Sequence, residues 1–193
     1  MERRDLPECA QGALYERGVY LRGLFIQRYA AVELAVTQLL MMCGRDPAYR
    51  ALGDVPQRMD DRLRRIETIL RMDGPVAAFA ERLWPSIEMF MGLEEDRHLL
   101  FHGLMSTGFD DGGQRVLSFR LYEQRGRTPR LRALDMPAAR LESLATLLEP
   151  VAWQFTALVA TIGRHLNPPK ASARGTPAPL PAPTAAVESH YVN

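Results

Sequence analysis

Cysteine is scarce in this chain. The two that occur, Cys9 and Cys43, lie too far apart in the sequence to form a CxxC motif. Two cysteines in a chain of this size are typical of ordinary thiols in a reducing compartment. We therefore expect no disulfide framework to hold this fold together.

The chain also lacks a surplus of either charge, because 24 lysines and arginines stand against 23 acidic residues. Bulk charge therefore gives no reason to expect nucleic-acid or membrane binding, and any electrostatic site must be a local patch. Residues 1–7 carry no apolar run, and Glu33, Thr37 and Gln38 interrupt the apolar stretch 30–43. We expect no signal peptide, no membrane span and a cytoplasmic location.

The motifs of the common enzyme classes are absent from the sequence. It contains no GxGxxG, P-loop, GxSxG or HExxH pattern, and its four histidines are at positions 98, 102, 165 and 190. A candidate site must therefore come from a less familiar arrangement of residues.

Helical periodicity dominates the 193 residues, which are enough for one core but too few for two typical domains. It predicts a helix over 18–43, a second capped by Asp54, a third over 76–102 with a kink or break near Trp84, and a fourth from Asp135 to Leu166 bent at Pro150. This predicts an all-α fold, a helical bundle of about four main helices.

Two segments depart from the helical pattern. Between Gly103, expected as a left-handed helix-ending residue, and Asp135 the period changes to two, which predicts a small hairpin or three-stranded flap over about 104–134. After Asn167 the composition becomes rich in Pro and Ala. We expect a domain over 1–168 and a disordered tail over 169–193.

A polar cluster interrupts the apolar face at the end of the third predicted helix. Glu94 and His98 share that face, and Arg97 and His102 flank it. Burial of such groups without partners is costly, so they either pair with each other or line a cleft or a subunit interface. A simple Glu94–His98 ion pair one turn apart is one interpretation.

The other interpretation uses the chemistry of RNA cleavage. A base takes the proton of the 2′-hydroxyl, an acid protonates the leaving oxygen, and a cation stabilises the phosphorane. Histidine suits proton transfer near neutral pH, and arginine holds phosphate without a metal. One helix carries a single strong set of these groups, which suggests that two chains combine their sets.

Arg97, four further residues and then His102-Gly103 resemble the R-x(4–6)-H signature of HEPN domains. The resemblance implies a dimeric, all-helical, metal-independent ribonuclease of a toxin–antitoxin, antiphage or RNA-processing system, with Arg97 and His102 as the catalytic pair. His98 is in the position that often carries Asn, Asp or His, and Glu94 would support the pair. An antitoxin or regulatory protein would be a partner. Some members are non-catalytic dimerisation or nucleotide-binding modules, and this is the alternative function.

Six arginines on the predicted flap form a candidate RNA-binding patch: Arg115, Arg120, Arg125, Arg127, Arg130 and Arg132. Only Glu123 is acidic between residues 115 and 132, so the flap could hold a phosphate backbone without reading its sequence. The alternative is a solvated hairpin whose arginines discourage aggregation through its edges.

A third interpretation takes Glu94, His98 and His102, spaced four residues apart, as ligands for zinc or another transition metal. A shell would then need a ligand from a partner chain. The leading interpretation predicts neither a metal nor a cofactor.

Overall fold

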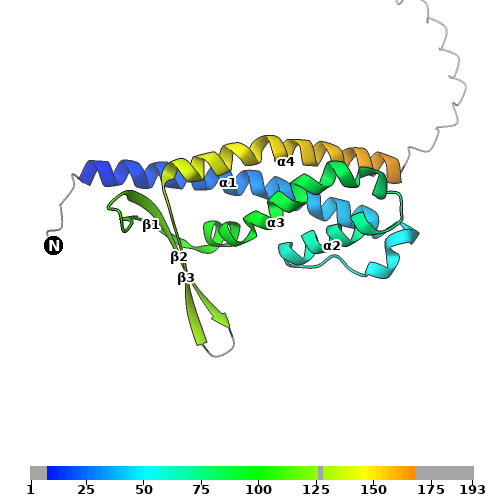
Figure 1. Ribbon diagram of the computed structural model, residues 1–193, viewed down its shortest axis with the longest axis horizontal. Helices are drawn as coiled ribbons and strands as arrows, with labels where there is room; N and C mark the ends of the chain where they lie inside the picture. Colours follow the sequence, from blue (N-terminus) through cyan, green and yellow to red (C-terminus); the bar gives the residue numbers. More distant parts are fainter. Residues whose placement is uncertain (1–7, 126–127, 168–193) are drawn as a thin grey trace, which may run out of the picture.

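The computed structural model describes residues 8–125 and 128–167 (Figure 1). The predicted tail over 169–193 lies outside the described residues. The helices and strands follow in chain order: α1 Glu8–Cys43, a 3₁₀ helix Pro47–Leu52, α2 Met59–Arg71, a 3₁₀ helix Ala77–Phe79, α3 Ala80–His102, β1 Leu104–Phe109, β2 Arg115–Arg125, β3 Thr128–Met136 and α4 Ala138–Leu166.

The predicted fold class is confirmed at the level of a mostly helical chain with a small antiparallel sheet. The three strands are ordered β1-β2-β3 and are inserted between α3 and α4. Their inner face packs on the helices through Met105, Leu117, Phe119 and Met136, all of which are buried. The far end of the β2–β3 hairpin extends away from the bundle in Figure 1.

Helices α1 and α4 run parallel along the length of the molecule (Figure 1). Arg17 forms an ion pair with Glu142 near the start of α4. Farther along α1, Arg28 donates a 2.7 Å hydrogen bond to the carbonyl of Ala145 and also contacts Glu149. The apolar stripes of both helices therefore face the same core.

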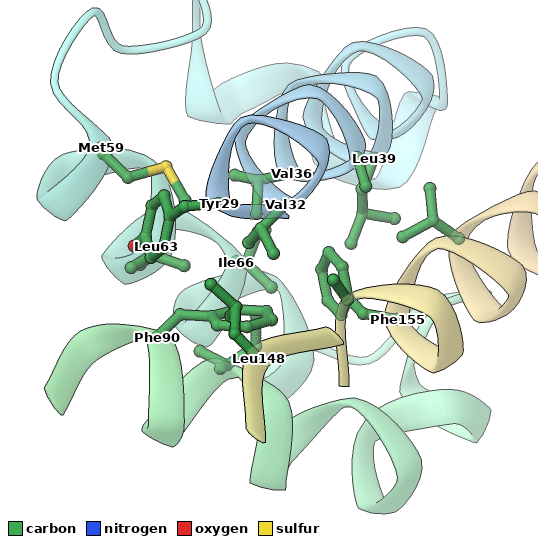
Figure 2. Close-up of a cluster of buried hydrophobic side chains, with 14 of the residues drawn as sticks. Tyr29, Val32, Val36, Leu39, Met59, Leu63, Ile66, Phe90, Leu148 and Phe155 are labelled. Carbon is green, nitrogen blue, oxygen red and sulfur yellow. The ribbon is translucent and has the colours of Figure 1, made fainter. Parts of the chain in front are cut away.

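Helices α2 and α3 close that core from the other side. Figure 2 shows Val32, Val36 and Leu39 of α1 facing Ile66 of α2 and Phe155 of α4. Their burial is nearly complete, so the stripes that periodicity identified are the stripes that pack. Cys43 is buried at the end of α1, and burial raises the pKa of its thiol to about 12, which keeps the thiol unreactive.

Several predicted helix boundaries are wrong. Helix α1 begins at Glu8, not near residue 18. Asp54 does not cap α2, because the helix begins five residues later at Met59 and has no side-chain cap. Pro56 favours extended backbone in the preceding residue, and the Arg62 guanidinium donates to the Pro56 carbonyl at 2.7 Å. These contacts hold the segment before α2 in a non-helical form.

The two internal prolines do not break their helices. Helix α3 is continuous from Ala80 to His102 with Pro85 inside it, so of the kink or break expected near Trp84 the break is absent. The change of geometry comes earlier, where the 3₁₀ helix Ala77–Phe79 passes into α3. Pro85 lies in the second turn, where only one backbone hydrogen bond is lost. Helix α4 likewise continues through Pro150.

Gly103 ends α3, but not in the left-handed conformation that the sequence suggests. Its φ is −71° and its ψ 142°, which is extended backbone. Glycine is needed here because an added Cβ would lie 2.5 Å from the Leu99 carbonyl oxygen and 3.4 Å from the backbone nitrogen of Arg120. This close approach allows β1 to begin directly after α3 and to pair with β2, where Leu104 lies opposite Arg120.

Helix α4 is long and apolar enough to cross a membrane by length and composition alone. The core helices of soluble proteins meet the same criterion, and α4 packs along α1 in this structure. The expectation of no membrane span rests on the interrupted apolar stretch 30–43 and does not take α4 into account.

Candidate functional site

A polar cavity of about 840 Å³ lies between the middle of α1, the start of α2, the end of α3 and the β2–β3 hairpin. Its charged lining residues comprise five acids and four arginines besides His98: Glu33, Asp60, Glu94, Glu95, Glu123, Arg58, Arg62, Arg97 and Arg132. A single copy of the chain therefore offers no positive surplus here. Of the predicted catalytic residues, Arg97 and His98 line this cavity.

Arg97 is held on the inner side of the cavity, with 13% of its side chain exposed. Its Nη2 donates a 3.0 Å hydrogen bond to Glu94, and its Nη1 donates a longer one of 3.4 Å to Glu33 of α1. The guanidinium carbon also lies 5.7 Å from the ring centre of Tyr29 and 5.4 Å from that of Phe101. Two carboxylates and two aromatic rings thus surround this cation.

Glu94 pairs with Arg97 and Tyr29, so the alternative interpretation of the cluster as a simple Glu94–His98 ion pair is wrong. The Tyr29 hydroxyl donates to Glu94 Oε1. Burial and this hydrogen bond raise the pKa of Tyr29 far above its ordinary value, so the phenol stays protonated. The Arg97 Nε lies 3.0 Å from the same oxygen but makes no hydrogen bond with it, because its N–H points elsewhere.

His98 faces the hairpin. Its Nε2 lies 2.8 Å from Glu123 Oε1 of β2, and Arg132 of β3 donates to the same oxygen at 3.0 Å. Burial lowers the pKa of His98 below its ordinary value, and the Glu123 charge only partly opposes this. Desolvation raises the pKa of Glu123, but the bonds and charges of Arg132 and His98 bring it below its ordinary value.

His102 is exposed in the last turn of α3 and is not among the residues that line the cavity. Its ring centre lies 5.0 Å from that of His98 and 6.2 Å from that of Phe101. The structure therefore places His102 beside His98, whereas the Arg97 guanidinium packs against the ring of Phe101. Among the described residues no hydrogen bond or ion pair joins Arg97 to His102.

The flap arginines do not form one patch. Arg115 and Arg125 stand at opposite ends of β2, about 30 Å apart for a strand of this length. Arg120 is held by Asp135 through two hydrogen bonds of 2.7 and 2.9 Å. Arg132 binds Glu123 and Glu95. Of the three acids that bind Arg120 and Arg132, Asp135 and Glu95 lie outside residues 115–132. Counting the acids within that range of the sequence therefore does not find them.

The remaining flap arginines are at the β2–β3 end. Arg130 is exposed and has no ion-pair partner within the part of the chain that the structure describes. Arg127 and the side chain of Arg125 lie outside the described residues. Arg130 is therefore the predicted RNA contact that is best placed to meet a phosphate.

The metal interpretation receives no support from this geometry. Glu94 turns toward Arg97, away from His98 and His102. Within residues 8–125 and 128–167 no group of three His, Cys, Asp or Glu side chains is arranged to hold a metal ion.

Sequence reasoning missed two carboxylates that shape the site, Glu33 and Glu123. Glu33 is the only charge in the apolar stretch 30–43, and an isolated charge within a core helix is a signal for a buried partner. Glu123 is the only acid between residues 115 and 132. In both cases the lone charge was visible, but the cation that it meets on another element was not.

Comparisons of this chain with protein-family models, with curated proteins and with solved structures found no match. The HEPN resemblance therefore rests on the Arg97–His102 motif and its helical setting.

Proposed function

We propose that this protein is a HEPN-like, metal-independent endoribonuclease that acts as a homodimer. The observation that carries the proposal is the grouping of Arg97, His98 and His102 at the end of α3, where two imidazoles lie 5.0 Å apart at the edge of a cavity of about 840 Å³. A role in a toxin–antitoxin or antiphage system, an antitoxin partner and a cytoplasmic setting belong to the same proposal.

The chemistry assigns one role to each residue. His98, neutral at pH 7 because burial lowers its pKa, accepts the proton of the 2′-hydroxyl. His102, exposed beside it, donates a proton to the leaving oxygen. Arg97 stabilises the phosphorane, and its 3.4 Å contact with Glu33 is the longer of its two contacts with carboxylates and the one that a phosphate oxygen would replace.

A second copy of the chain would add a second set of catalytic groups. The cavity lining of one copy holds more carboxylates than guanidiniums, so phosphate contact depends on particular arginines and not on a positive surplus of the lining. Because His102 is exposed at the end of α3, two such ends can meet and bring two sets of Arg97 and His102 to one cleft. Arg130 at the end of the hairpin would contact the RNA backbone.

A non-catalytic dimerisation or partner-binding module on the same scaffold is the second candidate. The closed arrangement of Arg97 between Glu33 and Glu94 favours it, because that cation already has two anionic partners. In that case Glu33, Glu94 and Arg97 hold α1 against α3, and the cavity binds a partner protein or a nucleotide without catalysing a reaction.

Product analysis separates these candidates. The purified protein is incubated with single-stranded RNA in the presence of a chelator. The ribonuclease proposal expects cleavage that leaves a 2′,3′-cyclic phosphate or its 3′-phosphate product. Cleavage that stops with chelator and returns with zinc contradicts the metal-independent mechanism, and RNA that is bound but left intact favours the module.

A further inference from the structure

We propose that Glu123, carried by the inserted hairpin, is a positioning residue that orients His98 for proton transfer. The inference rests on the proposed ribonuclease function and makes the hairpin part of the reaction site, beyond a surface for RNA. It is carried by the 2.8 Å contact between His98 Nε2 and Glu123 Oε1, which joins α3 to β2.

The carboxylate is itself fixed. Arg132 lies directly across the sheet from Leu121, and its Nη1 donates to Glu123 at 3.0 Å while its Nη2 donates to Glu95 of α3 at 2.8 Å. Glu123 and Arg132 are about one-fifth exposed, so solvent only partly competes for these bonds. The hairpin is thus attached to α3 at two points, one of which is the imidazole.

This contact determines which nitrogen of His98 can act. A neutral imidazole that donates its Nε2 proton to Glu123 must carry its free lone pair on Nδ1, so Nδ1 is the atom that accepts the substrate proton. The proton moves from the 2′-hydroxyl oxygen to Nδ1, and the Glu123 charge stabilises the imidazolium that forms. Glu123 itself stays ionised throughout.

The charged groups around His98 come from α3 and from both strands of the β2–β3 hairpin. Glu123 and Arg132 face it from the hairpin, and Arg97 and His102 face it from α3. Glu123 favours the charged imidazole, whereas the other three and burial disfavour it. The two hairpin residues should therefore shift the titration of His98 in opposite directions when each is neutralised.

The test uses the full-length protein and two readouts. The pKa of His98 is measured by NMR titration, with the resonance assigned from His98→Asn. Glu123→Gln, which keeps a hydrogen-bond acceptor but removes the charge, is expected to lower this pKa, and Arg132→Met to raise it. A purely structural role for the cluster would shift both variants in the same direction.

Activity is the second readout, with kcat and KM measured on single-stranded RNA. Glu123→Gln is expected to reduce kcat about tenfold or more with little change in KM, and to move the acidic limb of the pH–rate profile to lower pH. Glu142→Gln, which neutralises an ion-paired carboxylate on α4 away from the cavity, serves as the matched control.

Different results would contradict the positioning role of Glu123 and the ribonuclease function. An unchanged His98 pKa in Glu123→Gln, or shifts of the same sign in both hairpin variants, overturns the positioning role of Glu123 whatever the activity. Wild-type protein that cleaves no RNA overturns the ribonuclease, and the titration then decides whether Glu123 controls the imidazole. Unchanged kcat together with a shifted pKa overturns the claim that His98 is the base.

Discussion

At the scale of single residues, Arg97 has two roles that can be measured separately. It is a candidate for phosphate contact, and it is also the counter-ion of Glu94, which is only 16% exposed, and of Glu33. Removing one partner of a largely buried ion pair leaves the other charge uncompensated. A loss of activity in an Arg97 variant therefore has to be separated from a loss of stability.

We expect Arg97→Met to lower the free energy of unfolding by about 2 to 3 kcal/mol, a value below that of fully buried pairs because Glu33 is partly exposed. In a Glu94→Gln background the same change should cost less, since one stranded charge is gone. Urea unfolding of the four proteins measures this coupling. Equal costs in both backgrounds would mean that Glu94 does not hold Arg97.

His98 makes stability depend on pH. Its pKa is lower in the folded chain than the ordinary value of 6.5, so the unfolded chain binds a proton more readily. Its contribution to stability is present above pH 6.5 and is lost as the pH falls through its folded pKa. His98→Asn should flatten the decline of the melting temperature as the pH falls below about 6.5. A decline as steep as in the wild type would contradict this assignment.

At the scale of elements, the junction between α3 and β1 depends on Gly103. An added methyl group would meet the Leu99 carbonyl oxygen at 2.5 Å, and that backbone atom cannot move aside without disturbing the end of α3. We expect Gly103→Ala to cost more than about 2 kcal/mol through this overlap.

Gly113 is the matched control for that prediction. It lies in the β1–β2 turn with φ of 75°, and open space surrounds the position of an added Cβ. Gly113→Ala should therefore cost only about 1 kcal/mol, through backbone strain alone. The denaturant midpoints of the two variants are compared. A larger loss of stability in Gly113→Ala than in Gly103→Ala would contradict the role assigned to Gly103.

The elements differ in how far the sequence could predict them. The packed faces of α1 and α4 and the strands of the flap were predictable because apolar residues repeat at 3.6 or 2 positions. The start of α2 was not, because the arginine bonds that hold the preceding loop depend on the folded chain. The reason for Gly103 was likewise invisible, since β2 approaches it only after folding.

The candidate site could likewise be predicted from the sequence only in part. Periodicity placed Arg97, His98 and His102 at the end of one helix, and α3 does end at His102. Their partners could not be predicted, because Glu33 is 64 residues from Arg97 in the chain and Glu123 comes from a strand whose register is set by the whole sheet. Motif reasoning finds residues on one element, but the contacts between elements determine what those residues can do.

At the scale of the whole molecule, the proposed composite site, which would combine Arg97 and His102 of two chains, requires a homodimer in which the ends of α3 meet. Leu104, two residues after His102, is 77% exposed, and a charge there should disrupt such an interface. We expect Leu104→Glu to weaken the dimer and RNA cleavage together. Sedimentation at micromolar concentration measures the assembly.

Trp153 provides the control for the dimer prediction. It is 71% exposed on α4, a helix that contributes no residue to the cavity lining. Trp153→Glu should leave both the dimer and the activity unchanged. A dimer that Trp153→Glu separates while Leu104→Glu does not would place the interface on α4 and remove the composite site.

The proposed role of His102 in RNA cleavage is tested by comparing two histidine variants. His102→Ala is set beside His165→Ala, because both histidines lie in the last turn of a helix and are exposed. Cleavage of single-stranded RNA is measured in chelator at equal concentrations of folded protein. We expect a loss of activity of order 10² or more for His102→Ala and wild-type activity for His165→Ala. Equal turnover by wild type and His102→Ala would contradict it.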